Sequence, residues 1–373
     1  MTTGSGRALS VEVCTDEQAF ADLAGEWARL YRACRSATPF QTHSWLHSWW
    51  LSYGKPGALR LVLVRADGRL VAVAPLMRVR RPWPALVPVG GAISDFCDVL
   101  LDDTAADEGA PALAEALAGL ARTALIDFRE VRPGSSMERV YRSWRGPRRS
   151  LSDSTCLEVP VLPMAELVGR LPKPRGQRVR NKLRKLRKLG VRWRTVEHHE
   201  TEPALRRMLE LHRLQWQGRK VTPEHLRPRF LDHLVRSVVP LARSGEAVVK
   251  EFLLDDEVVT VDLTFRSGPW AGKYLYGVHP RLREHKVDVL TMMLDAAVDD
   301  LVSDEPSVLS FLRGSEPYKY RWLPETVVNQ RLLLARRRTA PLLAAAVCEA
   351  AARERCKRIL RRTGTAPGAP GPA

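Results

Sequence analysis

The sequence predicts an α/β fold of the α+β kind, in two domains that each have a mixed, largely antiparallel central sheet flanked by helices. The chain of 373 residues is long enough for two cores, because single hydrophobic cores stop growing near about 250 to 300 residues. Its composition, 45% hydrophobic and 27% charged, is ordinary for a folded protein. Both halves also repeat one order of elements, namely hairpin, strand, helix and strand.

The first half opens with a β-rich segment at 9–14 and a helical pattern at 16–33. A tryptophan-rich helix follows, for which Thr42 or Ser44 is the expected N-cap. Asp67-Gly68 predicts a tight hairpin, because this turn needs positive φ angles. The remaining elements predicted for this half are strands at 59–65, 70–79, 96–101 and 124–131 and a helix at 110–121.

The second half contains an antiparallel meander. Its three predicted strands are 248–254, 258–265 and 272–278. Asp288 is placed to cap a helix whose apolar positions recur at helical spacing from Leu290 to Leu301. A buried strand is predicted at 308–312.

These patterns predict an N-terminal domain over 1–160 and a C-terminal domain over 161–335. A basic helix is expected at 336–362. The segment 363–373, rich in Gly, Ala and Pro, is expected to be disordered.

The net charge of +17 is concentrated in two segments. Residues 170–194 hold 12 basic and no acidic residues, and residues 336–362 hold nine basic and two acidic ones. Each segment is either a solvated helix face or a surface for an anionic membrane or a polyanion such as tRNA.

The sequence contains no run of about 18 apolar residues, which a membrane-spanning helix requires. The predicted location is the cytoplasm, with a peripheral position at the inner membrane surface as an alternative. The six cysteines include no C-x-x-C pair, and His43 and His47 have no carboxylate beside them in the sequence. No metal site is predicted.

The segment from Ser310 to Trp322, with Phe40-Gln41-Thr42 and Leu214-Gln215-Trp216 upstream, resembles the GNAT-related acetyltransferases of the CelD/BioF-like type. Those proteins are similar to the FemABX peptidyltransferases, which contain two GNAT-like domains. The resemblance covers about residues 20–335 and departs from the family at two places. Ser315 stands where the family usually has aspartate, and residues 281–286 lack the glycines of the acyl-CoA signature.

The resemblance implies a set of site residues. Tyr318 corresponds to the tyrosine that protonates the leaving thiolate, with Tyr320 expected to pack. Two further catalytic candidates come from the residues themselves: Glu316 is the one carboxylate of that segment, and Asp262 lies on the polar face of the predicted strand 258–265. Each of the three candidates also has a structural alternative. Tyr318 would be a core tyrosine, Glu316 would form an ion pair with Lys319 or Arg321, and Asp262 would be a strand residue that faces water. The residues expected at the acyl-CoA donor are Val278, Arg281, Arg283, His285 and Lys286. The alternative is that this segment is a solvated basic loop that binds no donor. The residues expected at the acceptor are Trp216, Arg219, Lys319 and Arg321.

The predicted function is therefore N-acyl transfer from acetyl-CoA or another acyl-CoA to an amine, by analogy in envelope or exopolysaccharide biosynthesis. The acceptor would be a small molecule or a glycan-linked or lipid-linked amine. Two alternatives remain: an aminoacyl-tRNA-dependent FemABX-like peptidyltransferase, and a catalytically degenerate fold that binds anionic surfaces.

Overall fold

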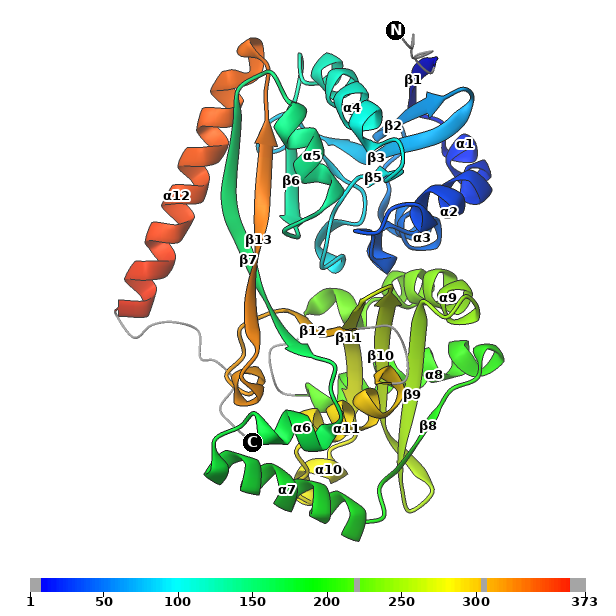
Figure 1. Cartoon of the computed structure of the whole chain (residues 1–373), viewed down its shortest axis with the longest axis vertical. Helices are drawn as coiled ribbons and strands as arrows, with labels where there is room; N and C mark the ends of the chain where they lie inside the picture. The colour runs from blue at the N-terminus through cyan, green and yellow to red at the C-terminus, as the bar shows by residue number, and fades with distance from the viewer. Residues whose placement is uncertain (1–7, 218–221, 303–306, 363–373) are drawn as a thin grey trace, which may run out of the picture. The chain divides into compact units, whose positions relative to one another are not determined.

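The computed structural model describes residues 8–217, 222–302 and 307–362 (Figure 1). The chain forms two compact units. Of the described residues, 8–154 and 328–362 belong to one unit, and those between Thr155 and Val327 belong to the other. The predicted disordered tail, 363–373, lies outside the described residues.

The first unit is built on a sheet with the strand order β1-β2-β3-β4-β6-β13, beside which β5 pairs with β3. The β4–β6 pair is parallel and the pairs β1–β2, β2–β3, β3–β4 and β6–β13 are antiparallel. Its strands are β1 (Leu9–Cys14), β2 (Leu59–Ala66), β3 (Arg69–Val79), β4 (Ala85–Pro88), β5 (Leu100–Leu101), β6 (Leu125–Val131), the start of β7 (Arg148–Pro160) and most of β13 (Glu325–Leu334).

Helices cover this sheet and bury one main core against it. Its helices are α1 (Glu17–Asp22), α2 (Ala24–Arg32), α3 (His43–Tyr53), α4 (Ala106–Leu120), α5 (Ser136–Ser143) and α12 (Ala340–Arg362). The core lies between the sheet and helices α4 and α5. The basic C-terminal helix α12 packs on the same unit through Leu343 and Ala346, which contact Leu125 and Leu333.

The aromatic segment before α3 has a structural role. Thr42 accepts a hydrogen bond from the backbone N–H of Trp45 and so caps α3, as predicted. The backbone carbonyl of Gln41 accepts the indole N–H of Trp27 at 2.8 Å, and the Gln41 amide donates to the carbonyl of Phe96 at 2.9 Å. The family landmark at 40–42 therefore joins two helices and a loop in this unit.

The second unit has the strand order β7-β12-β11-β10-β9-β8. The β11–β12 pair is parallel, and the other pairs are antiparallel. Besides the end of β7, its strands are β8 (Arg192–Thr195), β9 (Ala247–Leu254), β10 (Glu257–Ser267), β11 (Trp270–Val278) and β12 (Val308–Arg313). The predicted meander and the following strand are present, and the α/β fold class is confirmed.

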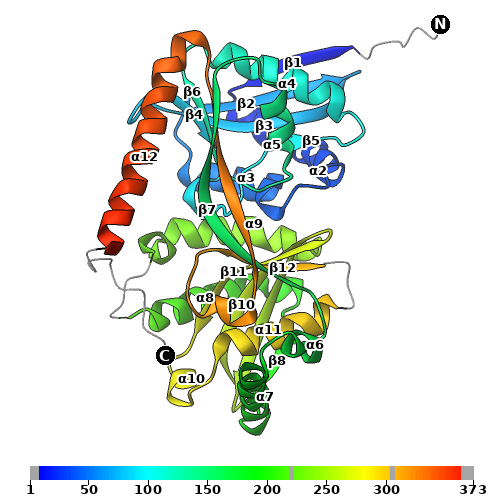
Figure 2. The same cartoon turned by 60° about the vertical axis from the view of Figure 1, so that its left-hand side comes forward.

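Helices lie on both faces of this second sheet (Figure 2). Helices α8 (Thr201–Gln215) and α9 (Pro228–Arg243) cover one face, and α6 (Met164–Gly169), α7 (Lys173–Lys188) and α11 (Val289–Leu301) cover the other. The short helix α10 (Arg281–Glu284) precedes α11. Asp288 caps α11 as predicted, accepting the N–H of Thr291 at 3.0 Å.

The structure differs from the sequence patterns at several boundaries. The helical pattern at 16–33 forms two helices that meet at Leu23, and only Leu100–Leu101 of the predicted strand at 96–101 is paired. The chain passes between units after Ser154 and Val327, whereas the sequence patterns placed the domain ends at 160 and 335. These crossings fall inside or next to long strands, where no turn residue marks them.

Gly277 sets the distance between α8 and β11. A Cβ atom at this position would lie 2.6 Å from the backbone N of His212 and would also meet the carbonyl oxygen of Met208. Both obstacles are backbone atoms, so a side chain cannot be accommodated by a change of rotamer. The helix therefore rests directly on the strand, which is possible only with glycine.

We expect Gly277→Ala to lower the free energy of unfolding by about 3 kcal/mol or more, because α8 must move away from β11. Urea denaturation followed by circular dichroism measures this loss. The matched control is Gly169→Ala at the end of α6, where an added Cβ meets nothing within 4 Å. Similar midpoints for both variants would contradict the close approach.

Candidate active site

The site begins where two parallel strands separate. Strands β11 and β12 pair only through Trp270–Gly272 and Val308–Ser310. Beyond these residues β11 continues to Val278, still paired with β10, while β12 continues to Arg313 beside β7. Among the described residues, the second half of β11 thus has a neighbouring strand on one edge only.

Tyr276 lies on this separated part of β11 and meets Tyr318, which follows β12. The two phenol hydroxyls share a hydrogen bond, and the side chain of Gln215, the last residue of α8, also hydrogen-bonds to Tyr276. The carboxylate of Glu316 is near enough to act electrostatically on both phenols. Three segments that are distant in the sequence therefore converge on one pair of hydroxyl groups.

Both phenols are kept protonated by their surroundings. Burial raises the pKa of Tyr276 above its ordinary value, and the nearby Glu316 and Asp262 carboxylates act in the same direction. Burial also raises the pKa of Tyr318, together with Tyr276 and Glu316. Because the surroundings disfavour the phenolate, both phenols carry their protons at neutral pH and are weaker acids than a solvated tyrosine.

Lys319 fixes the chain around Tyr318. Its buried ammonium donates to the carbonyl oxygens of Phe311 at 3.0 Å and Arg313 at 3.2 Å, and it lies 2.8 Å from a Glu316 carboxylate oxygen. One side chain thereby binds two carbonyls at the end of β12 and positions Glu316. An ion pair of Glu316 with Lys319 or Arg321 was the structural alternative, and the structure contains the pair with Lys319. This contact holds the tyrosine segment against β12.

Asp262 lies on β10 directly opposite Tyr276 in the strand register. One of its oxygens pairs with the buried ammonium of Lys273, which also donates to the Thr264 hydroxyl at 3.2 Å. Burial lowers the pKa of Lys273, and the Asp262 carboxylate opposes that shift. The second oxygen, Oδ1, is buried and has no hydrogen-bond partner among the described residues. Asp262 thus faces the interior of the second unit and not water.

Two histidines support the strand from the other side. The Nδ1–H of His212 donates to the carbonyl oxygen of Tyr276 at 2.9 Å, so in the neutral ring Nε2 is the acceptor. His225 therefore donates from Nδ1 to that nitrogen at 3.3 Å. Burial, together with the neighbouring His212, lowers the pKa of His225 to about 4. Both rings are neutral at pH 7.

The start of α11 is occupied by the chain's own charges. The Asp288 carboxylate, which caps the helix, is paired with Lys182 of α7 and with Arg321 at 3.3 Å. Burial alone would raise the pKa of Asp288, but the hydrogen bonds from Lys182 and the Thr291 amide outweigh it and leave the pKa lowered. An anionic group arriving at this helix start would meet a carboxylate that already uses both cations.

The other predicted donor residues lie around this helix start. Val278 ends β11, and Arg281 pairs with Asp255 and Glu257 of the preceding hairpin. Arg283, His285 and Lys286 are exposed. Their role in donor binding stays a prediction.

At the predicted acceptor side, Trp216 follows Gln215 and has a buried indole N–H without a partner in the described part of the chain. Arg219 lies outside the described residues. Lys319 and Arg321 make the contacts given above, and their acceptor role stays a prediction.

Sequence reasoning missed three residues of this cluster: Tyr276, Gln215 and Lys273. The alternation of the meander strands places Asp262 and Tyr276 on one face once their register is known. That register contains a bulge between Leu263 and Thr264, which no turn residue indicates. Gln215 stood in a family landmark but had no assigned role.

Within residues 8–217, 222–302 and 307–362, no three His, Cys, Asp or Glu side chains are grouped so that they could hold a metal ion. None of the helices that the structure describes has the length and apolar character to cross a bilayer.

We expect Asp262→Asn to lower the free energy of unfolding by about 3 kcal/mol, because it leaves the buried Lys273 ammonium without its counter-charge. Chemical denaturation at pH 7 measures the loss. The double variant Asp262→Leu with Lys273→Met should recover much of it, since an apolar pair carries no charge to desolvate. A double variant as unstable as the single one would refute this account.

Stability should also fall in acid through His225. Its native pKa is depressed to about 4, so between pH 6.5 and 4 the unfolded chain binds a proton that the native protein does not. We expect a loss of about 2 kcal/mol over this interval that His225→Phe lacks, measured by denaturation at each pH. The exposed His198 provides the control variant His198→Phe, which should keep the wild-type slope.

Residues 174–320 match the family described as acetyltransferase (GNAT) domain. No curated protein matches the sequence. Among solved structures, FemX is 12% identical and matches with a TM-score of 0.60, covering 89% of this chain and 99% of its own.

Two further structures have the same fold. The C-terminal domain of a protein assigned as a lysylphosphatidylglycerol synthetase from Agrobacterium fabrum is 12% identical, with a TM-score of 0.51 over 89% of this chain and 97% of its own. L-PGS from Bacillus licheniformis is 11% identical, with a TM-score of 0.53 over 91% of this chain and 97% of its own. The resemblance inferred from the sequence is confirmed at the level of the fold: residues 174–320 match the GNAT acetyltransferase domain, and the chain has a FemABX-like GNAT fold.

Proposed function

We propose that this protein transfers an acyl group from an acyl-CoA-type thioester to an amine, with Tyr318 as the general acid. The observation that carries the proposal is the hydrogen-bonded pair Tyr276 and Tyr318, both protonated at neutral pH, at the point where β11 and β12 separate. Placing a protonated phenol at the leaving group is a recognised form of acid catalysis. The GNAT domain match over 174–320 includes both tyrosines.

The reaction forms one C–N bond and breaks one C–S bond. The neutral amine attacks the acyl carbon, and the tetrahedral intermediate expels the thiolate. Tyr318 gives its phenolic proton to the departing sulfur, and the proton lost by the amine restores the phenol. The hydrogen bond to Tyr276 positions the Tyr318 phenol.

Two buried acceptor atoms near Tyr276 fit an amine substrate. The Oε1 atom of Gln215 and the Oδ1 atom of Asp262 are buried and have no donor within the residues the structure describes. Buried polar atoms are normally hydrogen-bonded, so such atoms indicate a missing donor. An amine or ammonium group supplies N–H donors, and Trp216 beside Gln215 is a further acceptor-side candidate.

Fold relatives suggest which amines to test. FemX and the lysylphosphatidylglycerol synthetases have this fold at low identity, which supports lipid-linked or peptidoglycan-linked acceptors in envelope or exopolysaccharide biosynthesis. Such precursors would place the protein in the cytoplasm, at or near the inner membrane surface. The CelD/BioF-like type remains the subfamily suggested by the sequence.

A second candidate donor is an aminoacyl-tRNA, as in the FemABX peptidyltransferases. The observation that favours it is Asp288, which occupies the start of α11 together with Lys182 and Arg321. A coenzyme A pyrophosphate held at that helix start would have to displace or compete with this carboxylate. An aminoacyl ester needs no such site, and its acyl transfer uses the same proton donor.

We expect Tyr318→Phe to lower kcat at least about 100-fold, because the leaving group loses its proton donor, with little change in KM for the donor. Release of CoA thiol from acetyl-CoA and longer acyl-CoAs, in the presence of a panel of amines, provides the assay. The matched control is Tyr320→Phe, two residues away, where the side chain is 41% exposed. A Tyr318→Phe rate equal to that of the control would refute the acid role.

Thermal stability in titrations with acetyl-CoA, longer acyl-CoAs and tRNA distinguishes the donors. Saturable stabilisation by a thioester supports the first proposal. Stabilisation by tRNA alone, steeply dependent on salt, supports the second. Failure of every donor would leave only a binding module on this fold.

A further inference from the structure

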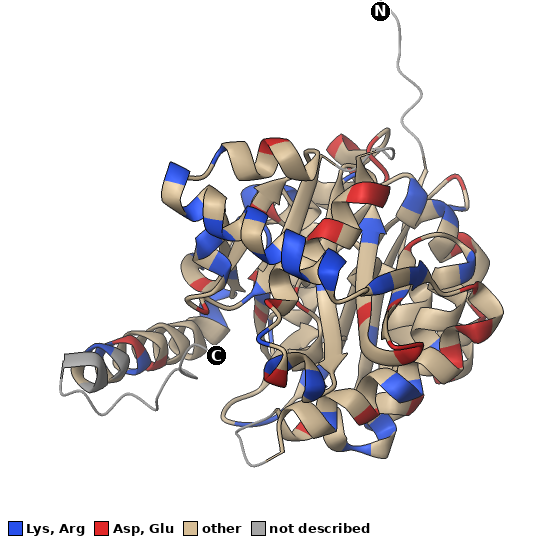
Figure 3. Ribbon diagram, turned by 90° about the horizontal axis from the view of Figure 1, so that it is seen from below, with Lys and Arg blue, Asp and Glu red and all other residues tan. Residues whose placement is uncertain are grey.

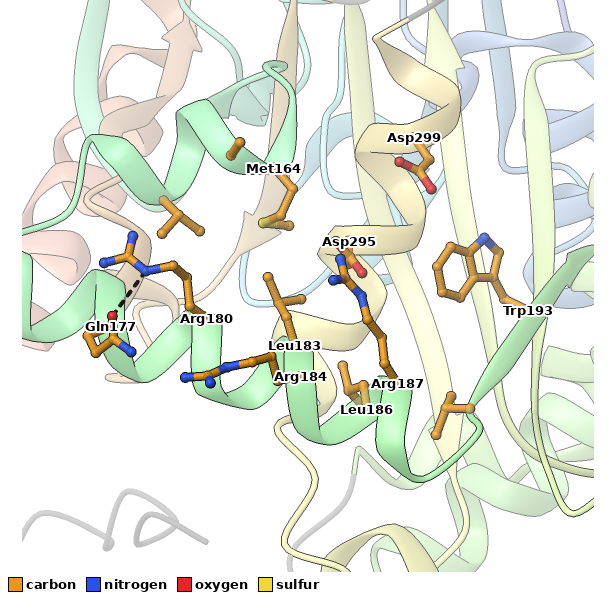
Figure 4. A pocket seen from close by; sticks show the side chains of 13 residues that line it. Met164, Gln177, Arg180, Leu183, Arg184, Leu186, Arg187, Trp193, Asp295 and Asp299 are labelled. Atoms are coloured by element: carbon orange, nitrogen blue, oxygen red, sulfur yellow. Dashed lines mark hydrogen bonds between the residues drawn. The ribbon is translucent and has the colours of Figure 1, made fainter.

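A hollow of about 560 Å³ lies beside helix α7, apart from the tyrosine pair (Figure 4). Helices α6, α7 and α11 and the start of β8 form its walls, all within the second unit. Its volume falls in the range of small-molecule sites, about 300 to 1,000 Å³. None of the residues discussed for catalysis lines it.

The floor of the hollow is apolar. It consists of side chains from α6, α7 and the following turn: Met164, Val168, Leu183, Leu186 and Val191. Trp193, whose side chain is 37% exposed, stands at one end. Indole groups of this kind, half in apolar surroundings and half in water, are typical of the boundary between a membrane and water.

Arginines form one rim. Arg180, Arg184 and Arg187 follow one another at helical spacing along α7 and are exposed. Arg180 and Arg184 contact the polar side chains of Gln177 and Asn181, and no described carboxylate lies within ion-pair distance of either. These guanidinium groups are free to bind phosphate.

Carboxylates form the opposite wall. Asp295 and Asp299 project from α11 toward the hollow (Figure 4). Burial and the neighbouring Asp299 raise the pKa of Asp295. The positive charge of Arg187 opposes this shift only in part. An extended polyanion that crosses the hollow would meet these like charges.

The surrounding helix is strongly basic. Residues 170–194 carry 12 Lys and Arg and no acidic residue, and the view from below shows basic segments along this part of the molecule (Figure 3). Clustered basic residues attract the anionic leaflet of a membrane. An apolar floor beneath a cationic rim matches one phospholipid, with its phosphate at the arginines and acyl chain carbons against the leucines.

We propose that the α7 hollow, lined by Arg180, Arg184, Arg187 and an apolar floor, docks the protein on a membrane by binding an anionic phospholipid. The site would hold the protein where a lipid-linked acceptor is found, yet binding does not depend on acyl transfer. It can therefore be tested without a known substrate.

The test compares two triple variants of the full chain in sedimentation with vesicles. Arg180→Gln, Arg184→Gln and Arg187→Gln together should weaken binding to phosphatidylcholine vesicles containing 30% phosphatidylglycerol by about 100-fold. The control removes three exposed charges from the same helix that do not line the hollow, by Arg178→Gln, Lys185→Gln and Lys188→Gln. The loss of vesicle affinity in this control should be at least tenfold smaller than in the hollow variant. Circular dichroism checks that both variants fold.

A second measurement separates the lipid from its headgroup. Dihexanoyl phosphatidylglycerol should raise the melting temperature of the wild-type protein saturably, and the hollow variant should not respond. Glycerol 3-phosphate at equal concentration should have a much smaller effect, because it lacks the acyl chains that cover the apolar floor.

Four outcomes would overturn the proposal. They are equal losses in the two triple variants, no binding to anionic vesicles at about 0.1 M salt, equal stabilisation by glycerol 3-phosphate, and preference of the hollow for tRNA over vesicles. None of these depends on whether Tyr318 is catalytic, so failure here and failure of acyl transfer are distinguishable.

Discussion

The candidate site depends on the parallel pairing of β11 and β12, which lasts for three residues and then ends. A strand that loses a neighbour in mid-sheet has to be held by other contacts. Gly277 brings α8 onto the backbone of β11, and His212 binds the carbonyl of Tyr276. On the other side, Lys319 donates to two carbonyls at the end of β12 and thereby holds Tyr318. The tyrosine pair is thus a consequence of how the separated strands are supported.

Buried charge accompanies this arrangement and costs stability. Lys273 with Asp262, and Lys250 with Asp300 at 2.8 Å, lie close enough on neighbouring strands and α11 to influence one another. Buried ion pairs are often no more stabilising than apolar residues of the same size, because desolvation cancels the attraction. Their presence beneath Tyr276 is better explained by positioning than by stability. Asp262 uses one oxygen for Lys273 and keeps the other toward the candidate amine site.

Local signals predicted local structure well. The Asp67-Gly68 turn, the Asp288 cap and the order of the meander follow from residue types that have few alternatives at those positions. The Tyr318 segment was found through a resemblance. Tyr276 and Gln215 were not found, because their meeting depends on a bulged register and on where a helix ends. No strand was predicted at Glu325–Leu334, whose residues fell in the predicted C-terminal domain, yet β13 pairs with β6 about 200 residues earlier. Sequence spacing carries no information about such a return.

Helix α7 shows how one basic segment serves different purposes on different faces. Lys182 turns toward α11 and neutralises Asp288, so this charge has a structural partner. Arg180 and Arg184, two residues away on either side, lie about 200° around the helix from it and face the hollow. A solvated basic face would need no such division, because exposed cations gain little from any particular direction. The placement of the arginines over an apolar floor, and not their number, is what favours a phospholipid phosphate as their partner.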